Sequence, residues 1–467
     1  MKMWSGRFRQ ALDPGFERWQ RSFDFDRRLL SHELAASSAH ARALKTAGVL
    51  NSTELIAILQ GLERIGEQAA SSPAFLEDDE AEDVHHFVEK QLVSLIGDTG
   101  YKLHSGRSRN EQIATDLRLY VRAAVDQIRS DLSAWCSALL DRAQQAGNAA
   151  MPAYTHLQRA EPVLVSHWLL AYIEIFLRDA ERLADCRKRL NVCPLGSGAV
   201  AGATLPLDRR ALAADLDFEQ PTANSIDATC DRDFVLEFVN VLSLLAVHLS
   251  RWAEEMILFS SQEYGFVELP EAYSTGSSAM PQKKNPDLLE LARGKCARVI
   301  GDSTALLICL KGLPLAYNKD LQETQEPLFD AAGTVLSLLP LVTGWMKVAE
   351  FNYETMQKAA QSGFMNAWAA ATYLVQRGVP FRLAHEHIGK AVQLCLEKTC
   401  ELQDLSLEEL RSVNAKFDQD FYACLKLESV LAIHDVPGGT APARVRQAMV
   451  DARQRIELIR EDAHAHA

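Results

Sequence analysis

The stretch between residues 275 and 286 holds the densest set of side chains that could do chemistry. It contains Ser277, Lys283 and Asn285 within the run TGSSAMPQKKNP. Pro286 suits the first position of a helix, whose free N–H groups and dipole would favour an anion. A serine acts as a base only if its alkoxide is stabilised, and nearby lysines with helix-end dipoles could provide this. The alternative is a solvated loop with exposed lysines.

A second candidate lies in LHSGRSRNE at residues 103–111. Ser108 and Glu111 have the S-x-x-E spacing of a capping box, which predicts the start of a long helix. Arg107, Arg109 and Asn110 beside that cap could hold a carboxylate. The alternative is an ordinary cap with surface arginines.

Two further polar segments complete the candidates. His156, in the predicted polar turn 154–162, could act as an acid or base near neutral pH. The segment 317–322 begins with Tyr317 and ends with Gln322. Both could equally be plain turns between helices. The chain has no HExxH, no Walker loop and no GxGxxG before a strand, so metal and nucleotide sites lack support.

Long helices must position these segments. Residues 107–146 and 222–264 contain neither Gly nor Pro, and their apolar residues recur at steps of three and four, as they do after Pro162. This period predicts long helices packed nearly parallel, and two more are expected over 287–312 and 323–350. The chain is therefore predicted to be mainly helical. The helix within 222–264 is apolar on more than one side, which favours a homo-oligomer over a thick monomeric core.

Shorter helices are expected on either side of this bundle. The predicted domains are 1–112, 113–361 and 362–467, with helices over 380–398 and 406–414 in the last. The acidic run at 77–83 is expected to be a solvated face.

Composition limits the partners and the compartment. The 467 residues include 62 acidic against 49 basic side chains, a net charge of −13 that argues against nucleic acid or an anionic membrane as partner. Nine cysteines without a CxxC pair suggest free thiols in a reducing compartment. The charge-free apolar stretch between Glu237 and Arg251 has 13 residues, too short for a bilayer, and the start does not resemble a signal peptide. A cytoplasmic protein is expected.

Taken together, the segments resemble one family. GSSAMPQKKNP at 276–286 resembles the signature of the fumarase/aspartase superfamily, whose members cleave C–N or C–O bonds and release fumarate. MWSGRF at 3–8, LHSGRSRN at 103–110, YTHLQRAEPV at 154–163 and LAYNKDLQE at 315–323 are narrower, and resemble the argininosuccinate lyase family. AEDVHHFVE, PLGSGAVAG and SIDATCDRDFVLEF extend the resemblance over most of the chain.

The resemblance implies an all-α fold of three helical domains, whose central bundle builds a homotetramer with each active site shared by three subunits. It implies reversible elimination of argininosuccinate to L-arginine and fumarate, without a metal or organic cofactor. Ser277 matches the base and His156 the acid, with Glu290 as its partner, although the two roles could be reversed. Lys283 and Asn285 match groups that stabilise the intermediate. The implied substrate contacts are Ser22, Arg109, Asn110, Thr155, Tyr317 and Gln322.

One departure concerns the tract YNKDLQEDKE of the family. Gln325 stands where a substrate-contacting lysine is usual, and Thr324 replaces an acid. The change is either a swapped surface ion pair, worth about 1 kcal/mol or less, or an alteration of substrate binding at Gln325. Two alternative functions therefore stay open. One is a sister lyase acting on another N-substituted succinate, and the other is a non-catalytic structural protein of the lens-crystallin kind.

Overall fold

The computed structural model describes residues 10–465, so the motif at 3–8 lies outside the described residues. The described part is mainly helical, as predicted, with four small two-stranded sheets. It divides into two compact units. The first comprises the chain up to Asp126 with Arg182–Ser243 and Arg298–Thr334, and the second comprises Gln127–Glu181, Leu244–Ala297 and Val335 onward.

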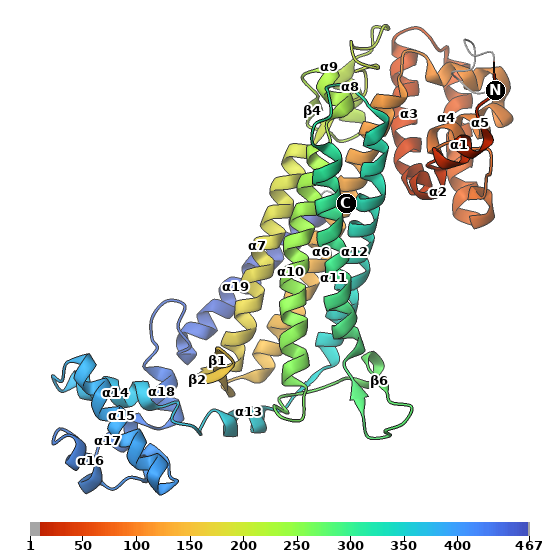
Figure 1. Cartoon of the computed structure of the whole chain (residues 1–467). Coiled ribbons are helices and arrows are strands. Elements are labelled where there is room, and N and C mark those ends of the chain that lie inside the picture. The colour runs from red at the N-terminus through yellow and green to blue at the C-terminus, as the bar shows by residue number, and fades with distance from the viewer. Residues whose placement is uncertain (1–9, 466–467) are drawn as a thin grey trace. The chain divides into compact units, whose positions relative to one another are not determined.

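Five long helices dominate the structure and contribute segments to both units (Figure 1). They are α6 (Arg109–Ala146), α7 (Val165–Leu190), α10 (Asp233–Phe259), α11 (Asp287–Leu310) and α12 (Gln325–Val348). The sequence therefore located all five, with α6, α7 and α10 identified by the period of three and four. The region 222–264 is not one helix, because α9 (Ser225–Cys230) ends before Asp231, which is extended and accepts a hydrogen bond from the Asp233 N–H at the start of α10. The division into three domains remains a prediction.

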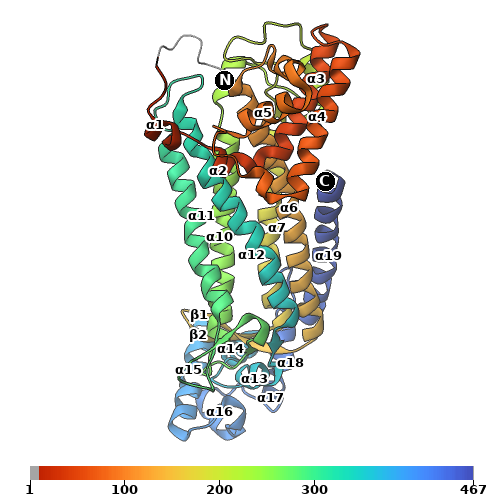
Figure 2. The same cartoon turned by 90° about the vertical axis from the view of Figure 1, so that its right-hand side faces the viewer.

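The first unit adds a set of shorter helices. They are α1 (Pro14–Trp19), α2 (Phe23–Asp26), α3 (Leu30–Thr46), α4 (Ser52–Ser71), α5 (Val84–Ile96) and α8 (Arg209–Asp215). Helices α3, α4 and α5 contact one another (Figure 2). Asn51 and Glu54 form a capping box at α4, and Asp83 caps α5 by accepting the His86 N–H. The expectation of a solvated acidic run is wrong at Asp83, which is buried because it serves as this cap.

Charged and aromatic side chains both join the long helices inside the first unit. Asp126 on α6 accepts two hydrogen bonds from Arg187 on α7, at 2.7 and 3.0 Å. Tyr120 on α6 meets Phe329 on α12 edge to face, with ring centroids 5.0 Å apart. These contacts join the first half of α6, which begins with the predicted Arg109 and Asn110, to α7 and α12.

Inside the second unit a row of tryptophans forms the core between the long helices. Trp135 on α6 contacts Trp252 on α10 at 4.8 Å between ring centroids, and Trp252 contacts Trp345 on α12 at 5.4 Å. All three are completely buried. Edge-to-face aromatic pairs stabilise a core beyond the area that they bury.

The second unit also contains the C-terminal helices and three of the four sheets. The helices are α13 (Tyr353–Ala359), α14 (Ala367–Gln376), α15 (Phe381–Lys398), α16 (Leu407–Val413), α17 (Phe421–Cys424), α18 (Leu427–Ala432) and α19 (Pro442–Ala465). The strands pair as β1 (Ala150–Thr155) with β2 (Gln158–Leu164), β5 (Val267–Glu268) with β8 (Glu350–Phe351), and β6 (Thr275–Gly276) with β7 (Lys284–Asn285). The fourth sheet, β3 (Val192–Cys193) with β4 (Gln220–Pro221), belongs to the first unit.

Two observations bear on the compartment. All nine cysteines are free, as predicted. By length and composition, the stretches Asp233–Phe259 and Lys319–Val348 are long and apolar enough to cross a membrane. The sequence analysis, which considered charge-free stretches, predicted no such segment. Half or more of each apolar window is buried inside the protein, and core helices of soluble proteins pass the same test.

Candidate active site

Six of the predicted substrate contacts line one cavity in the first unit. Its volume is about 180 Å³. The predicted residues that line it are Ser22, Arg109, Asn110, Tyr317, Gln322 and Gln325, and Glu82, Asp83, His86, Ile113 and Lys319 complete it. We call it the Arg109 cavity. Segments up to 300 residues apart in sequence therefore meet around a single space.

Local hydrogen bonds hold the rim of the Arg109 cavity. The Ser22 hydroxyl donates to Asp26 Oδ2 at 2.6 Å, and Gln322 Nε2 donates to the Gln20 carbonyl at 3.1 Å. The capping box predicted at the start of α6 is present in part. The Ser108 N–H donates to Glu111 Oε1 at 2.9 Å, while the Ser108 hydroxyl accepts from the Asn110 N–H at 3.3 Å.

The arginines beside this cap are not surface residues, so the alternative of a cap with exposed cations is wrong. The Arg107 side chain is 4% exposed and donates to the Ser37 hydroxyl at 2.9 Å. Arg109 forms a close ion pair with Asp83. Burial would raise the pKa of Asp83, but Arg109 and the neighbouring His85 hold it well below its usual range.

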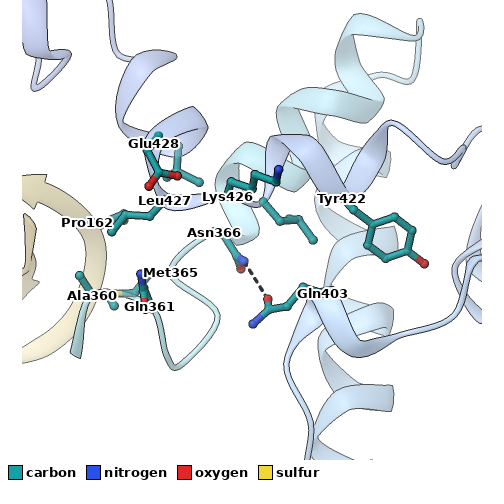
Figure 3. Close-up of a pocket in the computed structure, with 12 residues that line it drawn as sticks. Pro162, Ala360, Gln361, Met365, Asn366, Gln403, Tyr422, Lys426, Leu427 and Glu428 are labelled. Carbon is teal, nitrogen blue, oxygen red and sulfur yellow. Dashed lines mark hydrogen bonds between the residues drawn. The ribbon is translucent and has the colours of Figure 1, made fainter. Parts of the chain in front are cut away.

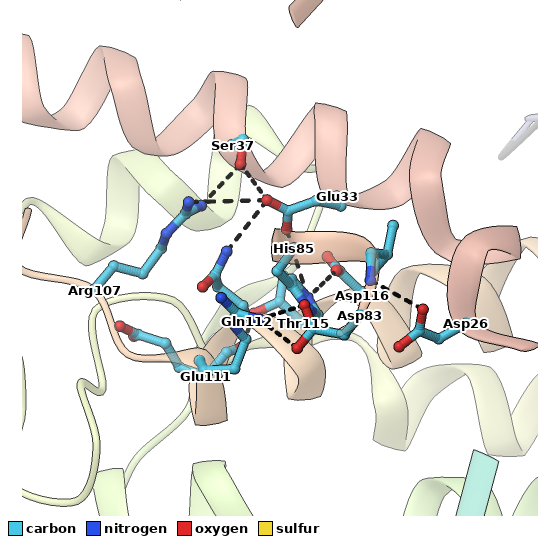
Figure 4. A network of polar contacts seen from close by, with 12 residues as sticks. Asp26, Glu33, Ser37, Asp83, His85, Arg107, Glu111, Gln112, Thr115 and Asp116 are labelled. Carbon is cyan, nitrogen blue, oxygen red and sulfur yellow. Dashed lines mark hydrogen bonds and ion pairs between the residues drawn. The ribbon is translucent and has the colours of Figure 1, made fainter. Parts of the chain in front are cut away.

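Behind the Arg109 cavity lies a buried polar network that the sequence reasoning did not single out (Figure 4). His85 Nε2 is 2.9 Å from Asp116 Oδ2 and 3.8 Å from Glu33 Oε2. We call Glu33, His85 and Asp116 the His85 cluster. The only sequence signal for it was the segment AEDVHHFVE, which contains Asp83 and His85.

The His85 cluster offers one ligand atom from each side chain, all within 4.8 Å of one another. Such a set could hold a divalent cation in another setting. Here the imidazole is engaged with Asp116, and the guanidinium of Arg107 lies 3.8 Å from Glu33. These cations supply the positive charge that the carboxylates need.

His156 sits at the tip of a β-hairpin, where we predicted only a polar turn. Thr155 pairs with Gln158, so His156 and Leu157 form a two-residue turn. Their φ angles are +55° and +57°, which is the left-handed conformation of a type I′ turn. Such turns usually contain Asn or Gly, and their absence hid the hairpin from the sequence. Thr155, His156 and Leu157 are all exposed.

The 275–286 segment is a second hairpin. Thr275 pairs with Asn285 and Gly276 with Lys284, which leaves Ser277 to Lys283 as the loop. The Ser277 hydroxyl accepts from the N–H groups of Ala279 and Met280 at 3.2 and 3.1 Å. In this conformation the serine therefore closes its own turn.

The residues that follow the loop prepare its exit into α11. Asp287 accepts from the N–H and the hydroxyl of Thr275, both at 2.8 Å, which ties the helix start to the first strand. Lys283 and Glu290 are exposed, and α11 begins one residue after Pro286.

The predicted residues thus fall into two groups. Thr155, His156, Ser277, Lys283, Asn285 and Glu290 belong to the second unit and do not line the Arg109 cavity. Among the described residues, no hydrogen bond joins His156 to Ser277 or to Glu290. The described part of one chain therefore assembles most substrate contacts around one cavity, whereas no hydrogen bond joins its acid/base residues.

The second unit has a cavity of its own, of about 310 Å³, which none of the predicted residues lines (Figure 3). Asn366 and Gln403 are joined there by a hydrogen bond of 3.3 Å, and Lys426 and Glu428 contribute charges of opposite sign.

Two family models match this chain. Residues 6–301 match the family described as Lyase, and residues 364–432 match Argininosuccinate lyase C-terminal. The chain is 60% identical over 460 residues to the argininosuccinate lyase of Acidobacterium capsulatum, covering 97% of this chain and 94% of that protein. It is 57% identical over 467 residues to that of Koribacter versatilis, covering all of both.

Solved structures give the same fold. An EDDS lyase variant with bound fumarate superimposes with a TM-score of 0.82 at 25% identity, covering 98% of this chain and 93% of that chain. The class II fumarase of Schistosoma mansoni gives a TM-score of 0.73 at 17% identity, covering 85% and 90%. The latter likeness is one of fold alone.

The hairpin turn generates a stability prediction. Leu157 is 66% exposed and left-handed, so Leu157→Gly removes backbone strain and little buried area, and should stabilise the protein by about 0.5–1 kcal/mol. The matched control is Leu396→Gly on α15, where a leucine of 65% exposure is helical and its loss should cost about 1 kcal/mol. Urea denaturation of both variants measures this, and equal destabilisation would contradict the strained turn.

Proposed function

This chain belongs to the argininosuccinate lyase family, and from that premise we propose how its residues carry out the reaction. It is a carbon–nitrogen lyase that splits argininosuccinate reversibly into L-arginine and fumarate, in arginine biosynthesis. The observation that carries this conclusion is identity of 57% or more, over almost the full length, to argininosuccinate lyases. The convergence of six expected substrate contacts on one cavity supports it.

The chemistry requires a base, an acid and a site for developing negative charge. A base removes a proton from the carbon beside a carboxylate of the succinyl group, which creates a dianionic aci-carboxylate. The C–N bond then breaks, and an acid protonates the leaving guanidine. Removing so weakly acidic a proton requires cations and N–H donors aimed at the growing oxyanion.

We assign these roles to groups of the second unit. Ser277 and His156 exchange the protons, with Glu290 as the carboxylate partner of His156. Lys283 and Asn285 hold the carboxylate and stabilise the aci-carboxylate. Support comes from the position of both groups on hairpins, where they stand free to meet a ligand. For catalysis Ser277 must leave the turn that its hydroxyl now closes, so movement of this loop is part of the proposal.

The Arg109 cavity binds the rest of the substrate. Arg109 pairs with a substrate carboxylate, and the side chains of Ser22, Asn110 and Gln322 supply hydrogen bonds. Tyr317 and Thr155 complete the contacts. No step of this scheme needs a metal or an organic cofactor, because cationic side chains and N–H groups can hold the developing charge.

We also propose that the working enzyme is a cytoplasmic homotetramer in which different subunits complete each active site. Large apolar side chains lie exposed on three long helices of the single chain, which is unusual for a soluble monomer. They are Leu244 and Val247 on α10, Leu291, Ile300, Leu307 and Ile308 on α11, and Leu341 and Val348 on α12. Contact with copies of the chain would cover them. Neither nucleic acid nor a membrane is an expected partner.

The proton-transfer roles lead to a kinetic prediction. Ser277→Ala and His156→Asn should each lower fumarate release from argininosuccinate by about 100-fold or more, because each removes an acid/base group. Ultraviolet absorbance of fumarate measures the rate. Ser278→Ala in the same loop and His385→Asn on α15 are matched controls, expected to stay within about twofold of the unaltered protein. Full activity of the Ser277 and His156 variants would refute the assignment.

The same assay separates the competing functions. The unaltered protein should release fumarate from argininosuccinate and not from adenylosuccinate or aspartate. Preference for another succinate would favour a sister lyase, a reading that Gln325 alone motivates. Absence of release from all three would favour a non-catalytic protein.

Gln325 is a buried residue beside the Arg109 cavity. Thr324 and Gln325 are 0% and 2% exposed, so the interpretation as a swapped surface ion pair is wrong. The Thr324 hydroxyl donates to the Leu321 carbonyl at 2.7 Å, whereas Gln325 lines the Arg109 cavity and its amide oxygen has no hydrogen-bond partner among residues 10–465. We propose that Gln325 contacts the substrate as an uncharged group.

Restoring the usual pair tests this role. Gln325→Lys alone puts a cation in a buried place without its acid, and should raise KM for argininosuccinate about tenfold. Adding Thr324→Asp should recover most of the loss, because the two charges then compensate each other. Steady-state kinetics of the two variants decides the matter. If Gln325→Lys alone has the same KM as the double variant, the charges at 324 and 325 do not compensate each other and the prediction is wrong.

The assembly is tested by light scattering. The unaltered protein should have four times the mass of the chain. Ile308→Glu, which puts a charge on the exposed apolar side of α11, should dissociate it and abolish activity. Leu396→Glu, at an equally exposed apolar position on α15, is the control and should keep both mass and activity. An active monomer would contradict the shared active site.

A further inference from the structure

Arg109 enters its cavity already paired. Its guanidinium binds both carboxylate oxygens of Asp83, whose side chain is only 12% exposed. A cation held by one buried carboxylate presents little net charge to an anionic ligand. Glu82 lines the same cavity and adds a further negative charge. Binding of a substrate carboxylate at Arg109 therefore requires that something offset Asp83.

His85 also lies close to Asp83 (Figure 4). Its Nδ1 is 3.7 Å from Asp83 Oδ1, and its Nε2 is 2.9 Å from Asp116 Oδ2. The imidazole is 2% exposed, so water does not screen these contacts. A histidine that faces a carboxylate with each ring nitrogen carries a proton on both only as the imidazolium.

The surrounding charges support a buried cation at this position. The charged groups that surround the ring are Glu33 on α3, Asp116 on α6, Asp83 before α5, Asp26 on α2, and Arg107 and Arg109 at the start of α6. Of the four carboxyl groups, burial raises the pKa of Asp26 to about 7 and that of Asp116 to about 8, while Glu33 and Asp83 face the cations Arg107 and Arg109. Burial alone would lower the pKa of His85, but its hydrogen bond to Asp116 and the nearby carboxylates of Asp83 and Glu33 raise it to about 10.

We propose that His85 is a positioning residue of the active site, acting as a buried cation that offsets Asp83. Asp83 can then fix the direction of Arg109 without cancelling the charge that Arg109 presents to the substrate. The same carboxylate caps α5 by accepting the His86 N–H at 2.7 Å, so its place in the fold is set independently of the ligand. This inference rests on the proposed role of Arg109 in substrate binding.

The protonation of His85 can be read without turnover. Neutron crystallography of the unaltered protein at pD 8 should find deuterons on both Nδ1 and Nε2. His40 is the internal reference. It is 1% exposed, burial and Arg107 lower its pKa to about 3, and its Nε2 faces the Ser105 carbonyl at 3.0 Å. It should carry one deuteron. A single deuteron on His85 would overturn the inference, whatever the fate of any variant.

A double-mutant cycle then tests how His85 acts. His85→Gln should raise KM for argininosuccinate about tenfold and leave kcat within about twofold, because Arg109 would lose charge toward substrate and transition state alike. In the Asp83→Asn background, where no charge needs offsetting, the same change should raise KM less than about twofold. If His85→Gln raised KM by the same factor in the unaltered protein and in the Asp83→Asn variant, the role of His85 would be merely structural and the inference would be overturned.

His40→Gln controls for the loss of a buried imidazole, and its KM should stay within about twofold. An equal rise of KM in this variant would also overturn the inference. Failure of the proposed function gives a different result, since the unaltered protein would then release no fumarate while the protonation of His85 could still be read.

Discussion

The candidate site depends on one buried carboxylate. Asp83 caps α5 through the His86 N–H and pairs with Arg109 at the start of α6. A single side chain thereby fixes two helix N-termini and the direction of the guanidinium that lines the cavity. Removing either partner of such a pair would leave a charge buried without compensation, so the arrangement tolerates little change.

The polar network behind Asp83 explains how so many charges can be buried together. Each carboxylate of the His85 cluster faces a cation, and the Glu111 carboxylate is held by the N–H groups of Ser108 and Gly198. Buried charges are tolerated when they are paired and hydrogen-bonded. The network therefore makes the N-terminal part of α6 rigid, while Ser277 and His156 lie on exposed hairpins outside it.

This contrast suits an elimination reaction. Substrate carboxylates need fixed donors, because electrostatic stabilisation works best with groups that do not reorganise. In the proposed scheme, proton transfer needs a serine that can leave its resting turn and approach the ligand. Contact between copies of the chain, which would cover the exposed apolar residues of α10, α11 and α12, is the means proposed for bringing such groups to a common pocket.

The sequence by itself determined the long helices, and for α6, α7 and α10 the reason is a period of three and four over stretches free of Gly and Pro, which admits little else. It also identified the motif residues, including the Ser108 cap, since local hydrogen bonding depends on neighbours in the chain. The hairpin at His156 escaped it, because two left-handed residues without Gly or Asn carry no turn signal.

Only the tertiary structure decided which side chains are buried together. Nothing local reveals that His85 contacts Asp116 or that Arg109 meets Asp83, since these partners come from helices far apart in sequence. The burial of Gln325 could not be predicted locally either. Its neighbours in the chain, Thr324 and Glu326, are polar, and only the fold encloses it. Local patterns fix backbone conformation, whereas desolvation depends on the packing of the whole unit.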